Sequence, residues 1–143
     1  MKTYNVGVAG SGFMGKAHTY AYKAIPFFYG ELPIDVNLRA ICSLPLKDAQ
    51  RAAKDYGYDI ATADLDEFFS NGLDIVHVCT PNDKHKPFIM EALKRGIHVY
   101  CEKPLTNNYE AAQEIEEALK GNKSIGQVGF HSRFYPCTIE RTS

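Results

Sequence analysis

The sequence predicts an α/β fold, a doubly wound parallel sheet with helices on both faces that together form a three-layer sandwich. Short apolar runs alternate with amphipathic segments of helical length along the chain. Several of these runs are almost continuously apolar, as strands are when helices cover both faces of their sheet. Because no internal repeat or low-complexity segment interrupts the alternation, we expect one sheet with the strand order 3-2-1-4-5-6.

The composition fits a single domain, residues 1–143, which is long enough to bury a core. Sixteen Lys and Arg residues and 17 Asp and Glu residues give a net charge of -1, which argues against a nucleic-acid partner or a basic membrane-binding surface. The first apolar run, Val6 to Ala9, is too short for a signal-peptide core or a membrane span, so we expect a cytoplasmic protein.

The four cysteines form no CxxC pair, so we expect reduced, structural thiols and no metal site.

A glycine-rich turn follows the first predicted strand, residues 5–9. It matches the pattern G-x-G-x-x-G with the residues Gly10, Ser11, Gly12, Phe13, Met14 and Gly15. The turn opens a helix in which Met14, Ala17, Ala21 and Ala24 recur at helical spacing. A preceding strand and a following helix are the context in which this pattern binds a dinucleotide, so the sequence favours a Rossmann-type domain. The alternative is a tight strand-to-helix turn without a ligand.

Each glycine of the pattern has an expected role. Gly10 would permit the tight turn, Gly12 would let the backbone approach a pyrophosphate, and Gly15 would let the helix pack closely on the strand. The phosphates would meet the positive end of the helix dipole. His18, one turn further along the helix, is expected to be a packed histidine rather than a catalytic one.

We expect the helix to end at Pro26, because proline lacks the backbone N–H that a helix interior needs. Residues 26–33 would then form an aromatic loop flanked by prolines. This loop either forms part of the rim of the cofactor cleft or is a surface loop without a role in binding, and we favour the second alternative.

The second predicted strand, residues 36–42, bears on the choice of cofactor. An acidic residue at its end would bind the ribose hydroxyls of NAD and repel the 2′-phosphate of NADP. Here Ser43 follows the strand and the first acid is Asp48, with Arg39, Lys47 and Arg51 nearby in sequence. The sequence therefore leans slightly towards NADP over NAD. Ser43 is equally consistent with a turn in a protein that accepts both cofactors.

The remainder of the chain continues the alternation. We expect further strands at residues 59–61, 74–79, 98–101 and 125–130, and further helices at residues 47–56, 65–69, 84–95 and after Asn107. Gly57 would end the first of these helices, Asp64 would cap the second, and Asn107 with Glu110 would form a capping box for the last. That last helix would place Ala111, Ala112, Ile115, Ala118 and Leu119 on its buried side. His77 is expected to be a hydrogen-bonded core residue.

Two turns should meet at one edge of the sheet. Thr80-Pro81-Asn82 follows the fourth strand, and Glu102-Lys103-Pro104 follows the fifth. The edge outside the carboxyl ends of parallel strands is where open α/β folds bind ligands. The sequence therefore predicts a nicotinamide site at this edge, with Lys103 beside it.

These motifs together resemble the N-terminal domain of the Gfo/Idh/MocA oxidoreductase family. The resemblance rests on the glycine loop, on Thr-Pro-Asn with His85 three residues later, and above all on residues 98–104, His-Val-Tyr-Cys-Glu-Lys-Pro. It implies hydride transfer between NAD or NADP and a hydroxyl-bearing carbon of a sugar, inositol or similar polyol. A nicotinamide dinucleotide is the implied partner.

The resemblance also implies roles for individual residues. Lys103 would act near the reacting hydroxyl, where its ammonium would stabilise a developing alkoxide. Glu102 would orient Lys103 or the nicotinamide amide, and Pro104 would shape the turn through a cis bond. Asn82 and His85 would lie along the cofactor. The alternatives are a solvated turn lysine for Lys103, and turn formation or helix capping for Asn82 and His85.

Finally, the resemblance implies a second, C-terminal substrate domain, with residues 131–143 as the start of the link to it. The chain by itself would then bind cofactor only, and the polyol would bind only with that domain. The alternatives are a free-standing dinucleotide-binding or sensor module and a non-catalytic remnant. An apolar surface around Phe130, Phe134 and Tyr135 would contact the second domain, and self-association into a homo-oligomer through it is a further option.

Overall fold

A computed structural model describes residues 2–139, which form one six-stranded parallel sheet. The strand order is β3-β2-β1-β4-β5-β6, and neighbouring strands are all parallel, as the sequence predicts. The strands are β1 (Lys2–Ala9), β2 (Ile34–Cys42), β3 (Ile60–Thr62), β4 (Ile75–Val78), β5 (His98–Cys101) and β6 (Gly126–Val128).

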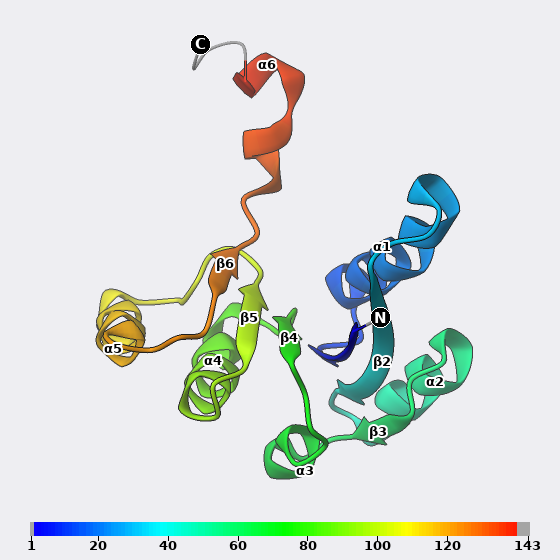
Figure 1. Cartoon of the computed structure of the whole chain (residues 1–143). Helices are drawn as coiled ribbons and strands as arrows, with labels where there is room; N and C mark the ends of the chain where they lie inside the picture. The colour runs from blue at the N-terminus through cyan, green and yellow to red at the C-terminus, as the bar shows by residue number, and fades with distance from the viewer. Residues whose placement is uncertain (1, 140–143) are drawn as a thin grey trace.

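Helices cover both faces of this sheet, which confirms the doubly wound, three-layer prediction (Figure 1). The helices are α1 (Phe13–Tyr29), α2 (Leu46–Tyr56), α3 (Leu65–Phe69), α4 (His85–Lys94), α5 (Tyr109–Leu119) and α6 (Pro136–Ile139). Short 3₁₀ turns lie at Asn82–Lys84 and His131–Phe134. Helices α1 and α2 lie on one face, and α3, α4 and α5 lie on the other (Figure 1).

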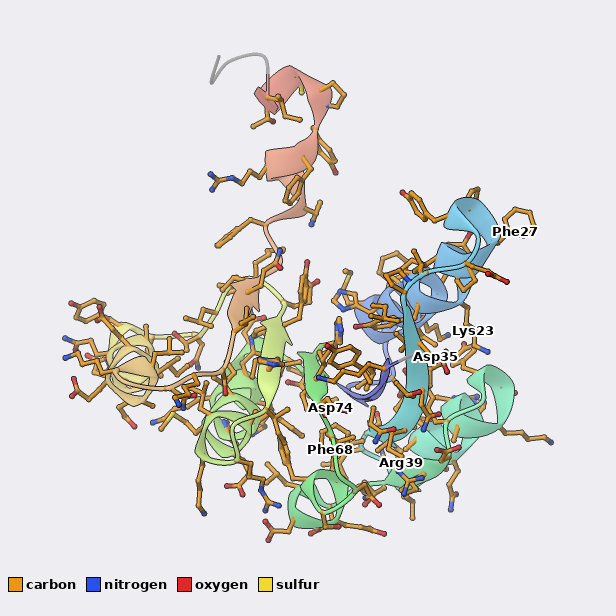
Figure 2. All side chains as sticks on the ribbon, in the orientation of Figure 1. Lys23, Phe27, Asp35, Arg39, Phe68 and Asp74 are labelled. Atoms are coloured by element: carbon orange, nitrogen blue, oxygen red, sulfur yellow. The ribbon has the colours of Figure 1, made fainter. Side chains whose placement is uncertain are left out.

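Two apolar cores hold these layers together. On one face, Val8 and Ile41 of the sheet pack with Ala49 and Ala52 of α2. On the other face, the helices contribute Phe68, Phe69, Ile89, Leu93 and Ile115, and the sheet contributes Val76, Val78 and Val99. Figure 2 shows Phe68 of α3 directed towards the sheet, where its side chain is fully buried. Each buried apolar side chain of this size stabilises the fold by about 1.5–3 kcal/mol, so the sheet is a rigid base for the loops at its carboxyl edge.

The prediction that Pro26 ends the first helix is wrong. Helix α1 runs through Pro26 to Tyr29, and the Gly30 N–H donates to the Pro26 carbonyl at 3.0 Å. Proline removes one backbone N–H from a helix, and here that loss falls in the last turn, where little helix remains to be disrupted. The first half of the predicted aromatic loop, residues 26–29, is therefore helix. Figure 2 shows Phe27 projecting outward from the end of α1, where the side chain is 83% exposed.

The buried side of α1 also differs from the predicted stripe. Ala21 is exposed, and the fully buried positions are Gly15 and Thr19. The Thr19 hydroxyl donates to the Gly15 carbonyl at 2.7 Å and contacts the Tyr58 hydroxyl at 2.7 Å. Because these bonds satisfy the hydroxyl, a polar residue occupies a core position that hydrophobic periodicity does not detect.

The helix caps are partly as predicted. Asp64 accepts from the Glu67 N–H at 2.8 Å, and Gly57 ends α2 in the left-handed conformation. The cap of α5 is Asn108, which accepts from the Ala111 N–H at 2.8 Å, so the prediction of Asn107 is wrong by one residue. Leu119, expected on the buried side of α5, is 40% exposed because it lies at the end of the helix. These shifts leave the strand order unchanged.

The chain after β6 leads away from the sheet (Figure 1). The 3₁₀ turn and α6 present Phe130, Phe134 and Tyr135 with exposures of 59%, 67% and 51%, so the predicted apolar surface is present. Of the expected link at residues 131–143, residues 140–143 lie outside the described part of the chain. Among residues 2–139, no helix has both the length and the apolar character needed to cross a bilayer.

Candidate functional site

The carboxyl ends of β1, β2 and β4 surround an open cleft of about 640 Å³. Backbone hydrogen bonds hold its walls together. The Gly10 N–H donates to the Cys42 carbonyl at 2.8 Å, and the Cys79 N–H donates to the Ala9 carbonyl at 2.7 Å. The cleft is lined by the glycine loop, by Lys16, by residues 43 and 44 after β2, by α2 and by Cys79, Thr80 and Pro81. The first of the two predicted turns thus contributes Thr80 and Pro81 to the cleft, whereas no residue of Glu102-Lys103-Pro104 lines it.

The three glycines of the loop differ in whether the fold itself needs a glycine at that position. Gly10 has φ +100°, and a Cβ there would lie 2.5 Å from the Cys79 carbonyl oxygen. A Cβ on Gly15 would lie 1.9 Å from the Gly10 oxygen. Gly12 has φ -71°, and no atom of the described chain lies within 4 Å of the position of its Cβ. Packing and backbone strain therefore explain Gly10 and Gly15, whereas Gly12 leaves open space above the backbone, as close approach of a pyrophosphate requires.

The start of α1 suits an anion. Gly12 caps the helix without a side-chain hydrogen bond, and the first turn of α1 contains no acidic residue. The first N–H groups of a helix lack intrahelical partners and carry the positive end of the dipole. A phosphate in the cleft would satisfy them.

Thr80 supplies a second sign that the cleft fits a ligand. Its hydroxyl oxygen is buried and has no hydrogen-bond partner among residues 2–139. A buried hydroxyl without a partner costs roughly 1–3 kcal/mol, so such groups usually have a bound partner in the functional state. Thr80 lines the cleft, with exposed Pro81 and Asn82 next to it in the chain. The residues at this edge therefore fit a dinucleotide.

The end of β2 carries no carboxylate. The Ser43 hydroxyl lies 2.8 Å from the Ser11 hydroxyl, so these two predicted site residues form one hydrogen-bonded pair. Asp48 lies at the start of α2, where its Oδ1 accepts from Arg51 at 2.9 Å. Lys16 and Arg51 both line the cleft. The lining of the cleft thus carries two cations, Lys16 and Arg51, and two acids, Asp48 and Asp55, with Arg51 paired to Asp48, and the end of β2 itself offers a hydroxyl group where an NAD site commonly has an acid.

The Glu-Lys-Pro turn separates its two charged side chains. The peptide bond between Lys103 and Pro104 is cis, as the sequence analysis anticipated. Glu102 is only 6% exposed, and its Oε1 lies 2.9 Å from Nε2 of His18. Gly129 leaves room for this carboxylate, because a Cβ there would lie 3.0 Å from Glu102 Oε1. Lys103 is exposed, and its ammonium forms no ion pair or hydrogen bond with the rest of the described chain. Glu102 therefore orients His18 rather than Lys103.

His85 lies behind the cleft. It is completely buried at the start of α4, with Nε2 2.8 Å from the Thr80 carbonyl and Nδ1 3.0 Å from the Pro104 carbonyl. One imidazole therefore ties the turn after β4 to the turn after β5. Its influence on a bound cofactor passes through the backbone of those two turns.

Hydrophobic patterning does not reveal a polar network next to Glu102. His18 Nδ1 lies 2.8 Å from His77 Nδ1, and His77 Nε2 lies 2.7 Å from the Tyr22 hydroxyl. Burial, and then the neighbouring His18, lower the pKa of His77 to about 3, and burial raises the pKa of Tyr22 to about 12. The expectations of a packed His18 and a hydrogen-bonded His77 are confirmed. Their connection to Glu102 was not predicted, because it joins residues far apart in sequence.

Three cysteines near the cleft remain neutral thiols. Burial raises the pKa of Cys42 to about 11 and those of Cys79 and Cys101 to about 12. Thiols with such values are poor nucleophiles at neutral pH. Cys42 and Cys101 are buried, as expected of structural residues, whereas Cys137 is exposed.

Known proteins match the chain over nearly its whole length. The model of a family described as an oxidoreductase family with an NAD-binding Rossmann fold, GFO_IDH_MocA, matches residues 4–130. Levoglucosan dehydrogenase of Pseudarthrobacter phenanthrenivorans is 33% identical over 137 residues, which are 95% of this chain and 35% of that protein. Inositol 2-dehydrogenase of an Arthrobacter species is 35% identical over 136 residues, 93% of this chain and 38% of that protein.

Solved structures give the same result. A levoglucosan dehydrogenase in complex with NADH and levoglucosan superposes with a TM-score of 0.88 at 32% identity, covering 96% of this chain and 37% of that one. An NAD-binding oxidoreductase from Klebsiella pneumoniae superposes with a TM-score of 0.87 at 35% identity, with coverage of 96% and 37%. The chain thus spans little more than a third of the length of the proteins it matches.

The glycine loop supports a matched pair of substitutions. We expect Gly12→Ala to change the free energy of unfolding by less than about 0.5 kcal/mol, because its Cβ enters open space, yet to weaken NADH binding at least about tenfold. We expect Gly15→Ala to destabilise the fold by more than about 2 kcal/mol, because its Cβ collides with a backbone oxygen. Urea denaturation and NADH titration of both variants measure these effects. Wild-type NADH affinity in Gly12→Ala would contradict the assigned role of Gly12.

Proposed function

This chain belongs to the Gfo/Idh/MocA family of oxidoreductases, and from that membership we propose that it is the cofactor-binding domain of a sugar or polyol dehydrogenase. The reaction is hydride transfer between a nicotinamide cofactor and a hydroxyl-bearing carbon of a sugar, an inositol or a similar polyol. Relatives named for levoglucosan and for inositol support this substrate class. The chain by itself binds the cofactor and does not turn over the polyol.

The observation that carries the proposal is the open space above Gly12. Neither the backbone conformation nor the packing of the described chain requires a glycine there, so a ligand that approaches the backbone best explains it. The adjacent helix start and the unpartnered Thr80 hydroxyl suit the phosphate and polar groups of a dinucleotide. The proposed contacts come from Gly10, Ser11, Gly12, Phe13, Met14, Gly15, Ser43, Thr80, Pro81, Asn82 and Glu102, with His85 holding two of the turns.

Lys103 is the proposed catalytic residue of this chain. It follows β5 at the carboxyl edge of the sheet, and its ammonium is exposed with no partner among residues 2–139. An ammonium held beside a reacting hydroxyl stabilises the alkoxide that develops as hydride leaves the carbon. The cis bond to Pro104 and the hydrogen bond of His85 to the Pro104 carbonyl fix the backbone of this turn.

Substrate selection is proposed to come from a second domain, with residues 131–143 as the start of the link to it. The chain spans between 35% and 38% of the length of the curated relatives it matches, which leaves most of each relative unaccounted for. The exposed Phe130, Phe134 and Tyr135 are suited to contact such a domain.

We also propose that the adenosine end of the cleft takes NADP somewhat better than NAD. Ser43 stands at the end of β2 where an acid usually binds the ribose, and Lys16, which lines the cleft, provides positive charge for a 2′-phosphate. Asp48, the nearest acid in sequence, is paired with Arg51. The solved levoglucosan dehydrogenase complexes, which hold NADH, are the observation against a preference for NADP.

Separate titrations with NADPH and NADH test the proposed function directly. The chain contains no Trp, so nicotinamide fluorescence or heat of binding is the suitable signal. We expect saturable binding of both dinucleotides, tighter binding of NADPH, and no polyol oxidation by the chain alone. Absence of binding for both would overturn the proposal, and efficient turnover by the chain alone would refute the need for a second domain.

A substitution at the end of β2 tests the choice of cofactor. We expect Ser43→Asp to shift the ratio of NADPH to NADH dissociation constants towards NADH by at least about tenfold, since a carboxylate there repels a 2′-phosphate and binds ribose hydroxyls. Gln113→Glu, at an exposed position of α5 on the other face of the sheet, adds the same negative charge and is the control for a general change in net charge. An unchanged ratio in Ser43→Asp would mean that residue 43 does not face the ribose.

Lys103 is tested by separating binding from chemistry. In the chain itself, we expect Lys103→Ala to leave the dissociation constant for NADH within about threefold of wild type, because a loss below about 0.7 kcal/mol is typical of one exposed charge. In a protein that also carries the substrate domain, kcat should fall by about 10²–10³. Equal losses in cofactor affinity and turnover would assign Lys103 to binding instead.

A further inference from the structure

We propose that Tyr22, His77 and His18 form a proton path that connects the surface beside α1 with the carboxylate of Glu102, the residue before Lys103. The path crosses from α1 to β4, returns to α1 and ends at the turn after β5. Three heavy-atom distances define it: 2.7 Å from Tyr22 to His77, 2.8 Å from His77 to His18, and 2.9 Å from His18 to Glu102. All three lie within hydrogen-bonding range.

The sheet and neighbouring rings hold the path in place. His77 on β4 is paired in register with Tyr100 on β5, and their rings stack with centroids 5.2 Å apart. His18 meets both rings edge-on, at 4.9 Å from His77 and 5.1 Å from Tyr100. His18 thus contacts the rings of His77 and Tyr100, and His77 contacts those of Tyr22 and Tyr100. Because of these contacts, the two imidazole rings have little freedom to rotate away from their partners.

The hydrogen bonds fix the tautomers of the neutral path. An ionised Glu102 only accepts, so His18 carries its proton on Nε2 and accepts at Nδ1. His77 must then donate from Nδ1 to His18, which leaves His77 Nε2 as the acceptor for the Tyr22 hydroxyl. Every donor therefore points the same way, from Tyr22 to Glu102. A single consistent set of protons satisfies all three contacts.

This arrangement allows a balanced transfer. A proton from water reaches the Tyr22 oxygen, the Tyr22 proton passes to His77 Nε2, and the His77 Nδ1 proton passes to His18 Nδ1. The result is one imidazolium, His18, beside the Glu102 carboxylate, while Tyr22 and His77 end neutral, with His77 in its other tautomer. His18 can then give its Nε2 proton to Glu102 Oε1. The reverse sequence returns one proton to water, so no oxidant or further reactant is needed.

The groups around His18 are compatible with this role. Glu102 faces one side of the ring, His77 faces the other, and the Cys79 thiol lies 3.6 Å from Nδ1. Burial raises the pKa of the Cys79 thiol to about 12 and also raises the pKa of the Tyr100 phenol, so neither competes for the proton near neutral pH. The pKa of His77, lowered to about 3, keeps that ring neutral, so it passes a proton by exchanging tautomers and not by holding a charge.

The outer end of the path reaches the surface at Tyr22. This side chain lines a cavity of about 350 Å³ together with His18, His77 and Tyr100. It also lines a groove of about 630 Å³ formed with Pro26, Leu32 and Val36. Water can therefore reach the path at Tyr22, which borders both recesses, and at the two histidines, which border the smaller one.

The use of the path in catalysis rests on the proposed function, whereas its existence does not. Oxidation of a hydroxyl releases one proton, and reduction of the carbonyl consumes one. Glu102 precedes Lys103 in the chain, and it is only 6% exposed, so water has little direct access to its carboxylate. Tyr22, His77 and His18 would act on the reaction only through Glu102, which makes them positioning and relay residues.

Nitrogen NMR of the five histidines in this chain is the first test, because ring nitrogen shifts report tautomer and charge for each histidine. When both rings are neutral, we expect the Nε2–H tautomer for His18 and the Nδ1–H tautomer for His77. In the form in which both nitrogens of His18 carry a proton, His77 should be the neutral Nε2–H tautomer. His98, whose Nδ1 accepts from the Ile125 N–H at 2.9 Å, is an internal reference for the Nε2–H form.

Hydrogen exchange of the His77 ring proton separates a path from a packing role. If protons pass through the Tyr22 hydroxyl, Tyr22→Phe slows this exchange several-fold. If Tyr22 only packs, the loss of its hydroxyl loosens the site and speeds exchange or leaves it unchanged. Tyr20→Phe, at a 68% exposed position on the same helix, is the matched control and should leave the rate unchanged.

Each outcome bears on the proposal. The predicted tautomers together with slowed exchange support it. An Nδ1–H tautomer for neutral His18, independent protonation of His77 near neutral pH, or unchanged or faster exchange in Tyr22→Phe would each overturn it. These measurements need no cofactor, so they stay informative if the chain fails to bind NADH, and a failed path would leave the cofactor-binding proposal standing.

Discussion

The close contact between α1 and the glycine loop is the constraint on which the rest of the site depends. A Cβ on Gly15 would lie 1.9 Å from the Gly10 carbonyl oxygen, so the helix reaches its position only because residue 15 has no side chain. Gly10 in turn lies against the Cys79 carbonyl at the end of β4. These two contacts set how deeply α1 sits on the sheet. They bring the helix start to the cleft and, one turn later, bring His18 within hydrogen-bonding distance of β4 and of Glu102.

The sequence was sufficient to predict the architecture, because the features that determine it are local and repeated. Apolar runs of strand length, Gly57 after α2 and Asp64 before α3 each indicate an element or its end without knowledge of the rest of the chain. The glycine pattern, read with its flanking strand and helix, located the cleft correctly. The errors lie at helix ends. Pro26 lies inside the last turn of α1, and the cap of α5 is one residue later than predicted, because an isolated proline or asparagine fixes a boundary only loosely.

What the sequence could not reveal is the polar interior on the α1 face of the sheet. Thr19, His77 and Glu102 are polar residues in buried positions, and each is satisfied by a partner more than 35 positions away. Patterns of hydrophobicity assign such positions to the surface or leave them as unexplained interruptions of a strand. The partners become apparent only when parallel pairing sets His77 beside Tyr100 and packing lays α1 across both. One signal was available: a histidine in the middle of an otherwise apolar strand requires a buried hydrogen-bond partner.

The turn after β5 divides two functions between neighbouring residues. Cys101 and Glu102 are both buried, whereas Lys103 is exposed, so the chain passes from the interior to the surface directly after the strand ends. The Glu102 carboxylate contacts His18 inside the domain. The Lys103 ammonium has no partner among residues 2–139 and can contact a group outside the domain. The cleft for the dinucleotide is built at β1, β2 and β4, away from this turn. If Lys103 has the proposed catalytic role, a domain organised in this way can hold a cofactor by itself, whereas Lys103 acts only when a substrate is placed beside it. Binding and turnover are therefore expected to separate in this chain.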